Sequence, residues 1–352
     1  TGLGHNHPKI TKAIQEQAGA LIHCSNLYQI PEQEALATKL CSLSNMETVF
    51  FSNSGAEANE AAIKLARLFG HNKGIETPVI IVAEQSFHGR TMATLSATGN
   101  RKVQAGFEPL LSGFARVPYG DVEAINQVAL NNKNVVAIFV EPIQGEGGIQ
   151  IPHPEYLNNL RTITDKQDWL LMVDEVQTGM GRTGAWFAHQ HNGIAPDVMT
   201  LAKGLGNGVP IGACLARDKA AEILAPGTHG STFGGNPLVS RASLATINAI
   251  ESDSLIDRAT FIGNAIAQGL RTNFSDEASI VDIRNKGLMI GIELDRPCVS
   301  IVDHALEAGL LLNVTADSVI RLLPPLILDD EQIKFLIVSL TKVINKFLEE
   351  SK

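Results

Sequence analysis

The sequence of 352 residues has few cysteines, few aromatic side chains and no cluster of basic residues. Its four cysteines are far apart and show no metal-binding spacing, so we expect free thiols in a reducing cytoplasm. The formal net charge is -9, and without a lysine/arginine patch nucleic acid is not an expected partner. No apolar run predicts a membrane span, and no signal peptide is recognisable.

What is present is typical of an α/β enzyme with more than one domain. Hydrophobic residues make up 44% of the chain, and 31 glycines allow many tight turns between strands and helices. We predict an N-terminal segment at 1–44, a large domain at 45–240 and a smaller α+β domain at 241–352. Because the sequence starts at Thr1 rather than at a methionine, we expect the first segment to be truncated.

Apolar runs of strand length alternate with helical patterns, which predicts βαβ units and a mostly parallel sheet. The predicted strands of the large domain are Val79–Ala83, Val135–Val140, Trp169–Val173, Val198–Leu201 and Ile211–Ala216. Its predicted helices are Ala56–Phe69, Pro154–Lys166 and Pro237–Glu251. In the smaller domain we predict strands at Ile280–Arg284, Leu288–Leu294, Leu310–Val314 and Val319–Leu322, and then a terminal helix capped by Asp329 or Asp330.

Lys203 is the first candidate for a catalytic residue. It follows the apolar run Val198–Leu201 and precedes a glycine-rich stretch at 204–208. A charged lysine is costly to bury at the end of a strand, so burial would favour a neutral, nucleophilic amine that can form a Schiff base. A solvated loop lysine and a phosphate-binding lysine are the alternatives.

Asp174 follows the apolar run Trp169–Val173, at the carboxyl end of a strand, where α/β sheets bind ligands. The 29 residues from position 174 to position 203 suffice for one crossover and a return strand, which would bring Asp174 and Lys203 to one edge of the sheet. A carboxylate facing a pyridine nitrogen keeps that nitrogen protonated. A helix cap or a metal ligand is the alternative, and because too few other ligands converge we predict no metal.

Three further segments suit anion or ring binding. The small, polar turn Ser52–Glu57 precedes a helix, where free N–H groups bind anions, although an ordinary helix cap explains it equally well. Phe87 and Arg90 suit a planar ring and a carboxylate, or else a core aromatic beside a surface arginine. Arg321 is set into an apolar strand, so it forms either a structural salt bridge or a carboxylate-binding site.

Six motifs, in the order in which they occur along the chain, resemble those of the class III (ω-amino acid) pyridoxal-phosphate aminotransferases, most closely the acetylornithine/succinylornithine group. They are Ser54–Asn59, Phe87–Thr91, Glu141–Gly148, Asp174–Gly179, Lys203–Gly206 and Gly230–Pro237. The resemblance extends over essentially the whole chain. It implies the fold type I of pyridoxal-phosphate-dependent transferases, an α/β fold with a seven-stranded, mostly parallel sheet flanked by helices and a smaller α+β C-terminal domain.

The resemblance also implies roles around pyridoxal 5′-phosphate. Lys203 would hold the cofactor as a Schiff base and then move the substrate proton, and Asp174 would pair with the pyridinium nitrogen. Val176 and Phe87 would lie on the two faces of the ring, and Gln177 would reach its phenolic oxygen.

The phosphate and the substrates would be bound by other motif residues. Ser54, Gly55 and Ala56 would bind the phosphate together with Thr232 of a neighbouring subunit, so that a homodimer is the smallest active unit. Arg321 would bind the α-carboxylate of glutamate or 2-oxoglutarate, and Glu146 would pair with Arg321 when the amine donor is bound. Arg90 would bind the far carboxylate of these two substrates, or the α-carboxylate of acetylornithine, and Glu141 would support residues near the cofactor.

The resemblance therefore implies a cytoplasmic enzyme that transfers the δ-amino group of N-acetylornithine to 2-oxoglutarate in arginine biosynthesis. Succinylornithine, ornithine and 4-aminobutyrate are alternative donors. An aminomutase or decarboxylase on the same fold would share Lys203 and Asp174, and a catalytically silent binding protein could also retain the fold.

Family members carry some tens of residues before the segment Gly2–Pro8, and those residues help to line the substrate pocket. We expect His5 and His7 in a turn with capping histidines rather than in a metal site.

Overall fold

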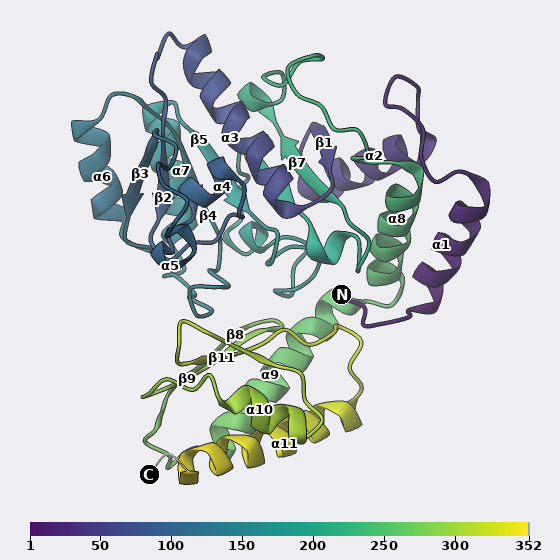
Figure 1. Cartoon of the computed structure of the whole chain (residues 1–352), viewed down its shortest axis with the longest axis vertical. Helices are drawn as coiled ribbons and strands as arrows, with labels where there is room; N and C mark the ends of the chain where they lie inside the picture. Colours follow the sequence, from purple (N-terminus) through teal and green to yellow (C-terminus); the bar gives the residue numbers. More distant parts are fainter. Residues whose placement is uncertain (351–352) are drawn as a thin grey trace.

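A seven-stranded sheet forms the centre of the larger of two lobes in the computed structural model, which describes residues 1–350 (Figure 1). The strand order is β1-β7-β6-β5-β4-β2-β3, and only β7 runs antiparallel to its neighbours. The strands are β1 (Thr48–Ser52), β2 (Val79–Ala83), β3 (Phe114–Val117), β4 (Val135–Val140), β5 (Leu170–Asp174), β6 (Val198–Leu201) and β7 (Gly212–Ala216).

Helices cover both faces of this sheet, so its central strands are buried and mostly apolar. Every residue of β4 is buried. On β2, Ile80 packs in the cluster that contains α3 (Gly55–Asn72), while Ile81 packs in the cluster with α6 (Val122–Asn131) and α7 (Tyr156–Gln167). Successive side chains of one strand therefore serve two hydrophobic layers.

The five strands predicted for the large domain are confirmed to within one residue, and the predicted helices are α3, α7 and α8 (Pro237–Ser252). The prediction missed β1 and β3. Both are edge strands, and only two residues of β1 and one of β3 are buried, so neither shows a continuous apolar run.

The N-terminal segment forms α1 (Pro8–Ala20) and α2 (Pro31–Ser44), which pack against α8 beside the larger lobe (Figure 1). Short helices α4 (Met92–Ala97) and α5 (Arg101–Gln104) follow β2, and 3₁₀ turns occur at Ala188–Asn192, Lys203–Leu205 and Asp218–Ala220.

The division into domains remains a prediction. Its boundary at 240/241 falls inside the continuous helix α8.

The smaller lobe contains a four-stranded antiparallel sheet in the order β10-β11-β9-β8. Its elements are α9 (Leu255–Asn273), β8 (Ile280–Lys286), β9 (Met289–Leu294), α10 (Ile301–Glu307), β10 (Asn313–Thr315), β11 (Val319–Leu322) and α11 (Asp330–Glu350). The range predicted for β10, Leu310–Val314, begins three residues and ends one residue too early. Asp329 caps α11, since its side chain accepts a hydrogen bond from the Gln332 amide at 2.8 Å.

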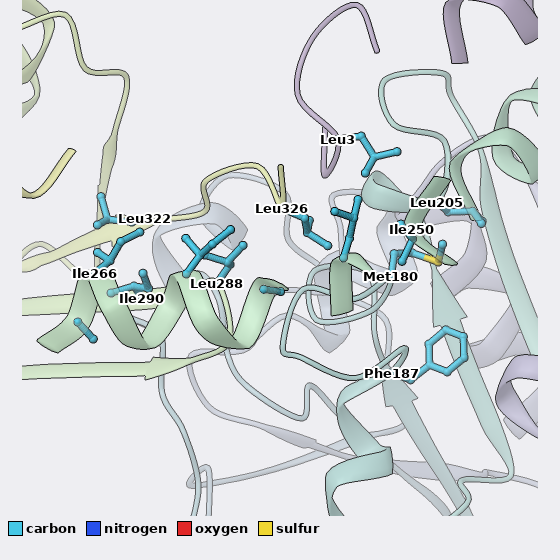
Figure 2. Close-up of a cluster of buried hydrophobic side chains, with 14 of the residues drawn as sticks. Leu3, Met180, Phe187, Leu205, Ile250, Ile266, Leu288, Ile290, Leu322 and Leu326 are labelled. Carbon is cyan, nitrogen blue, oxygen red and sulfur yellow. The ribbon is translucent and has the colours of Figure 1, made fainter. Parts of the chain in front are cut away.

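One hydrophobic cluster continues from the larger lobe into the smaller one (Figure 2). Leu3, Leu205 and Ile250 lie on the side of the larger lobe, and Leu288 and Leu322 belong to the smaller lobe. This shared core fixes the small sheet, and therefore Arg321 on β11, relative to the ends of the large-sheet strands. Within residues 1–350, no helix is both long and apolar enough to cross a membrane.

Candidate active site

A cavity of about 590 Å³ opens at the carboxyl ends of β4, β5 and β6. The parallel pairing of β5 with β6 sets Asp174 beside Thr200, three residues before Lys203, so the expected convergence of Asp174 and Lys203 is confirmed. The predicted site residues that line the cavity are Ser54, Gly55, Ala56, Phe87, Arg90, Glu141, Glu146, Asp174, Val176, Gln177 and Lys203.

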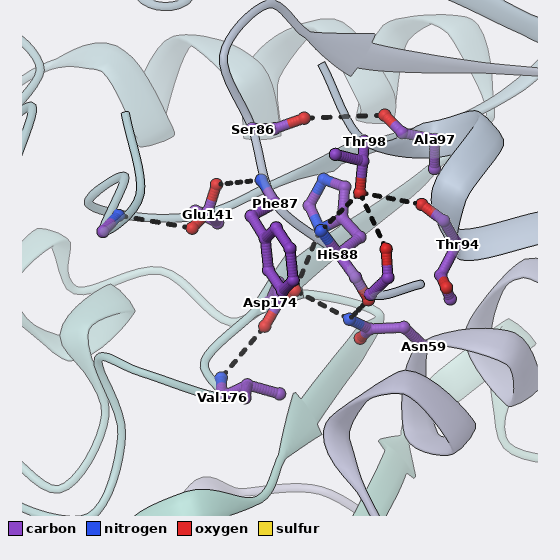
Figure 3. A network of polar contacts seen from close by, with 12 residues as sticks. Asn59, Ser86, Phe87, His88, Thr94, Ala97, Thr98, Glu141, Asp174 and Val176 are labelled. Carbon is purple, nitrogen blue, oxygen red and sulfur yellow. Dashed lines mark hydrogen bonds and ion pairs between the residues drawn. The ribbon is translucent and has the colours of Figure 1, made fainter. Parts of the chain in front are cut away.

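The Asp174 carboxylate is buried and held by three N–H donors (Figure 3). One oxygen, Oδ2, lies 2.8 Å from Asn59 Nδ2 and 2.9 Å from His88 Nδ1, and the other, Oδ1, accepts from the Val176 amide at 3.0 Å. These bonds come from α3, from the segment after β2 and from the turn after β5. They hold the carboxylate in one orientation at the floor of the cavity.

Asn59 and His88 are functional candidates to which the sequence analysis gave no role. Asn59 is one helical turn beyond Gly55, so it faces the same cavity, and its amide also donates to the His88 carbonyl at 2.7 Å. The His88 ring stacks on Phe139 of β4 with centroids 4.2 Å apart. Both residues stand inside the quoted motifs, and the helical spacing of Asn59 was the available signal.

The amino end of α3 presents free backbone amides to the cavity. The Ser54 side chain caps the helix by accepting from the Glu57 amide at 3.2 Å, and Glu57 Oε2 accepts from the Asn53 amide at 2.7 Å. The first amides of a helix have no acceptor within it, so those of Gly55 and Ala56 remain available to an anion.

Gly55 is needed for the close approach of α3 to the turn after β5. A Cβ at this position would lie 2.8 Å from Val176 Cγ1, closer than side-chain carbons pack. The glycine therefore lets the helix end, with its free amides, lie directly against Val176.

Lys203 lines the cavity from the turn that follows β6, and its backbone has a φ of 42°. A non-glycine residue in this left-handed region is strained by about 1–2 kcal/mol, which is typical of functional positions. Lys203 is exposed, so the expectation that it would be buried at the strand end is wrong. The left-handed turn directs the chain out of the sheet immediately after Leu201 and Ala202, which are buried.

Glu141 is a buried carboxyl group directly after β4. Burial raises its pKa to about 7, while the charge of His88 lowers that pKa and the charge of Asp174 raises it. Its two oxygens accept from the Phe87 amide at 3.1 Å and the Gly145 amide at 3.3 Å. Glu141 therefore links the segment that carries Phe87 to the loop that carries Glu146.

Arg321 lies on β11 of the small sheet and joins this sheet to the larger lobe through Glu146, which lines the cavity. Arg321 itself lines a separate cavity that shares Thr1 with the first. Its Nη1 lies 2.7 Å from Glu146 Oε1 and 3.5 Å from Gln177 Oε1, and its Nε donates to Asn313 Oδ1 at 3.2 Å. A Cβ on Gly145 would lie 2.1 Å from Gln177 Oε1, so the absence of a side chain there leaves room for Gln177. The arginine thus forms a salt bridge with a residue that also lines the cavity.

Arg90 and Thr232 are the two predicted site residues whose surroundings have not yet been described. Arg90 lines the cavity, is exposed, and has no ion pair among the described residues. Thr232 does not line this cavity; it is exposed beside a separate cavity of about 380 Å³ that shares Asn53 with the first.

A metal site would need several ligating side chains to converge. Within the described residues, no group of three or more His, Cys, Asp or Glu side chains is placed to hold a metal ion.

His7 occupies the N-cap position of α1 (Pro8–Ala20), but its side chain makes no capping hydrogen bond, so the expected capping by histidine is wrong.

The donor set fits pyridoxal 5′-phosphate. Asp174 offers a fixed carboxylate to a ring nitrogen, Phe87 and Val176 offer apolar surface to a ring, and Lys203 offers an amine to an aldehyde. The cleared space at Gly55 and the amides at the amino end of α3 suit a phosphate. These groups converge on one cavity, and all of them come from elements fixed by the large sheet.

Comparison with known proteins assigns this arrangement to a family. The sequence profile of class III aminotransferases matches residues 1–344. The chain therefore belongs to the class III aminotransferases, which are pyridoxal-phosphate-dependent transaminases.

Individual relatives are similar over nearly the whole chain. An acetylornithine aminotransferase from Nitrosomonas europaea is 57% identical over 99% of this chain and 88% of its own length. One from Methanothermobacter thermautotrophicus is 48% identical over 97% of this chain and 86% of its own length. The crystal structure of ornithine aminotransferase from Toxoplasma gondii superposes with a TM-score of 0.94 at 34% identity, over 99% of this chain and 84% of that one.

Proposed function

We propose that this protein transfers the δ-amino group of N-acetylornithine to 2-oxoglutarate, giving N-acetylglutamate 5-semialdehyde and glutamate. The observation that carries the proposal is the 2.7 Å ion pair between Glu146 and Arg321 at the cavity that contains Lys203 and Asp174. The similarity to acetylornithine aminotransferases at 46–57% identity supports N-acetylornithine as the donor.

We assign different cavity residues to the ring and to the phosphate of the cofactor. Asp174 would pair with the ring nitrogen, Phe87 and Val176 would contact the ring, and Gln177 would bind the phenolic oxygen. Ser54, Gly55 and Ala56 bind the phosphate at the amino end of α3. Pyridoxal phosphate, when bound, supplies an aldehyde and an electron-accepting ring. The Lys203 amine would hold the cofactor and would then be placed to move the substrate proton.

One pocket must accept two different substrates in turn. The dicarboxylate 2-oxoglutarate presents a carboxylate to Arg321, whereas the end of N-acetylornithine that carries the reacting amine presents none. Paired with Glu146, Arg321 is neutralised for the amine donor; released from Glu146, it binds the dicarboxylate. The unpaired Arg90 binds the remaining carboxylate of either substrate.

The visible spectrum of the protein loaded with pyridoxal phosphate tests both half-reactions. N-acetylornithine alone should replace the band of the pyridoxal form with that of the pyridoxamine form, and 2-oxoglutarate should restore it. Lys203→Ala should bind the cofactor without this cycle. A response to ornithine, succinylornithine or 4-aminobutyrate and none to N-acetylornithine would refute the proposed donor, and no response to any amine would refute a transaminase.

We also propose a homodimer in which Thr232 binds the phosphate of the neighbouring subunit. An exposed apolar patch beside Thr232 supports it, formed by Leu21, Ile22, Leu27, Tyr28 and Phe233. Asn26 Nδ2 donates to the Ser231 carbonyl at 3.0 Å and so ties the two segments of this patch together. Sedimentation should give twice the chain mass for the wild type and a shift toward monomer for Leu27→Asp; a monomeric, active wild type would refute the dimer.

The cellular setting follows from the same chemistry. We propose a role in arginine biosynthesis in the cytoplasm, with the two small-molecule substrates as partners and no nucleic acid or membrane. The acidic net charge of -9 and four cysteines without disulfide bonds support this setting. An arginine auxotroph that lacks its own acetylornithine aminotransferase should grow without arginine when it expresses this protein, and failure of the active protein to restore growth would refute the role.

A further inference from the structure

Glu146 lines two cavities. One is the cofactor cavity, where the Glu146 carboxylate meets Arg321. The other, of about 460 Å³, lies on the other side of the loop 146–147 and is also lined by Asn100, Arg101 and Lys102. Glu146 therefore borders both the cofactor cavity and this second cavity.

Four segments enclose the second cavity. The loop 146–147 lies against the residues after β2, since a Cβ on Gly147 would be 3.1 Å from the Gln85 carbonyl. The segment 99–102 is held beside them by the bond from the Gln85 amide to the Gly99 carbonyl at 3.3 Å. The turn between β10 and β11 completes the wall with Ala316 and Asp317, so the hairpin that carries Arg321 also borders the second cavity.

The positive charges of the second cavity differ in their partners. Lys102 Nζ lies 2.9 and 3.2 Å from the two Asp317 oxygens, so its charge is already compensated. Arg101 is exposed and makes no ion pair within residues 1–350. Its charge also contributes, after burial, to a lowered pKa of Arg116, whereas the nearby Glu84 raises that pKa. Arg101 is therefore a cation that has no ion pair within residues 1–350.

A dicarboxylate that binds Arg321 leaves Glu146 without its partner. An unpaired carboxylate beside a second carboxylate is unfavourable, because like charges at short distance repel. We propose that the Glu146 side chain then turns into the second cavity and pairs with Arg101, so that Arg101 is a positioning residue for dicarboxylate binding. This inference rests on the proposed function, because it assigns a second position to the same switch.

Binding of glutarate, a dicarboxylate that cannot transaminate, measures the effect without catalysis. Arg101→Ala should raise the Kd of glutarate for the pyridoxal-phosphate-loaded protein about threefold to fivefold, the range of a partly exposed ion pair. Arg101→Lys should restore most of the affinity. Lys133→Ala is the matched control, since Lys133 is an exposed cation just before β4, at the opposite edge of the sheet.

Single-turnover rates separate the two substrates. Arg101→Ala should slow the half-reaction with 2-oxoglutarate through a higher apparent Kd, and should change the half-reaction with N-acetylornithine by less than about twofold. Equal slowing of both half-reactions would indicate a general structural defect and would overturn the inference.

A double variant tests whether Arg101 acts through Glu146. In a Glu146→Gln background, Arg101→Ala should change glutarate affinity by less than about twofold, because the charge that Arg101 receives is gone. The full effect of Arg101→Ala in that background would show direct contact with the ligand and overturn the proposal. If the wild type does not react with N-acetylornithine at all, the proposed function fails, and the glutarate measurements still decide the role of Arg101.

Discussion

Replacing Glu146 with glutamine removes the negative charge that faces Arg321 and keeps the side-chain shape. Because 2-oxoglutarate must displace Glu146 from Arg321, whereas the amine donor needs the pair intact, the substitution should act on the two half-reactions in opposite directions. We expect tighter 2-oxoglutarate binding and a slower reaction with N-acetylornithine.

The size of the effect follows from the exposure of the pair. The Arg321 side chain is 9% exposed and the Glu146 side chain 39% exposed, with 2.7 Å between Nη1 and Oε1. Exposed pairs contribute about 0.2–1 kcal/mol, and removal of one partner from a buried pair costs about 3–5 kcal/mol. This half-exposed pair should therefore contribute about 1–2 kcal/mol, or roughly fivefold to thirtyfold in an equilibrium constant.

Single-turnover absorbance measurements give the apparent Kd and limiting rate of each half-reaction separately. Glu146→Asp is the control, since it keeps the charge on a shorter side chain and should retain the wild-type order of preference. If Glu146→Gln changes both half-reactions by the same factor, or neither, the pair does not switch between substrates.

Three further changes test other parts of the structure. Gly55→Ala should weaken pyridoxal phosphate binding about tenfold with little loss of folding, because its Cβ would lie 2.8 Å from Val176 Cγ1; an unchanged Kd in a cofactor titration would refute the close approach. Glu141 has its pKa raised from 4.5 to about 7 by burial, so the stability contributed by its protonated form should be lost as the pH rises from 5 to 8. Urea unfolding should show the wild type losing about 2.5 kcal/mol more over this interval than Glu141→Gln, and parallel pH profiles would contradict it. Leu340→Ala, at a fully buried position of α11, should lower the free energy of unfolding by about 3 kcal/mol, and a loss below about 1 kcal/mol would show that α11 contributes little packing.

The regular elements of the large sheet were predictable because each carries its own local signal. The continuous apolar run of β4 and the capped helix α3 are recognisable in short windows of sequence. The strand β3 has a single buried residue and carries no such signal, which is why it was missed. The motif residues Asp174 and Lys203 could likewise be identified, since each closely follows a predicted strand.

Contacts between distant residues were not predictable in this way. The helical spacing of Asn59 places it on the cavity side of α3, but it does not indicate that Asn59 and His88 both donate to Asp174, which is 115 and 86 residues away along the chain. The exposure of Lys203 was also missed, because it depends on a left-handed backbone turn and not on the apolar run before it.

The sequence by itself determined the class of fold, the family and the residues that supply amine, carboxylate and phosphate-binding groups, because these depend on local patterns and short motifs. The tertiary structure decided that Arg321, from the small sheet, meets Glu146, and that Glu146 borders a second cavity with Arg101. These relations arise from packing between lobes through the shared hydrophobic core. Such packing is set by the sum of many weak contacts between residues far apart in sequence, and no short segment of the chain encodes it.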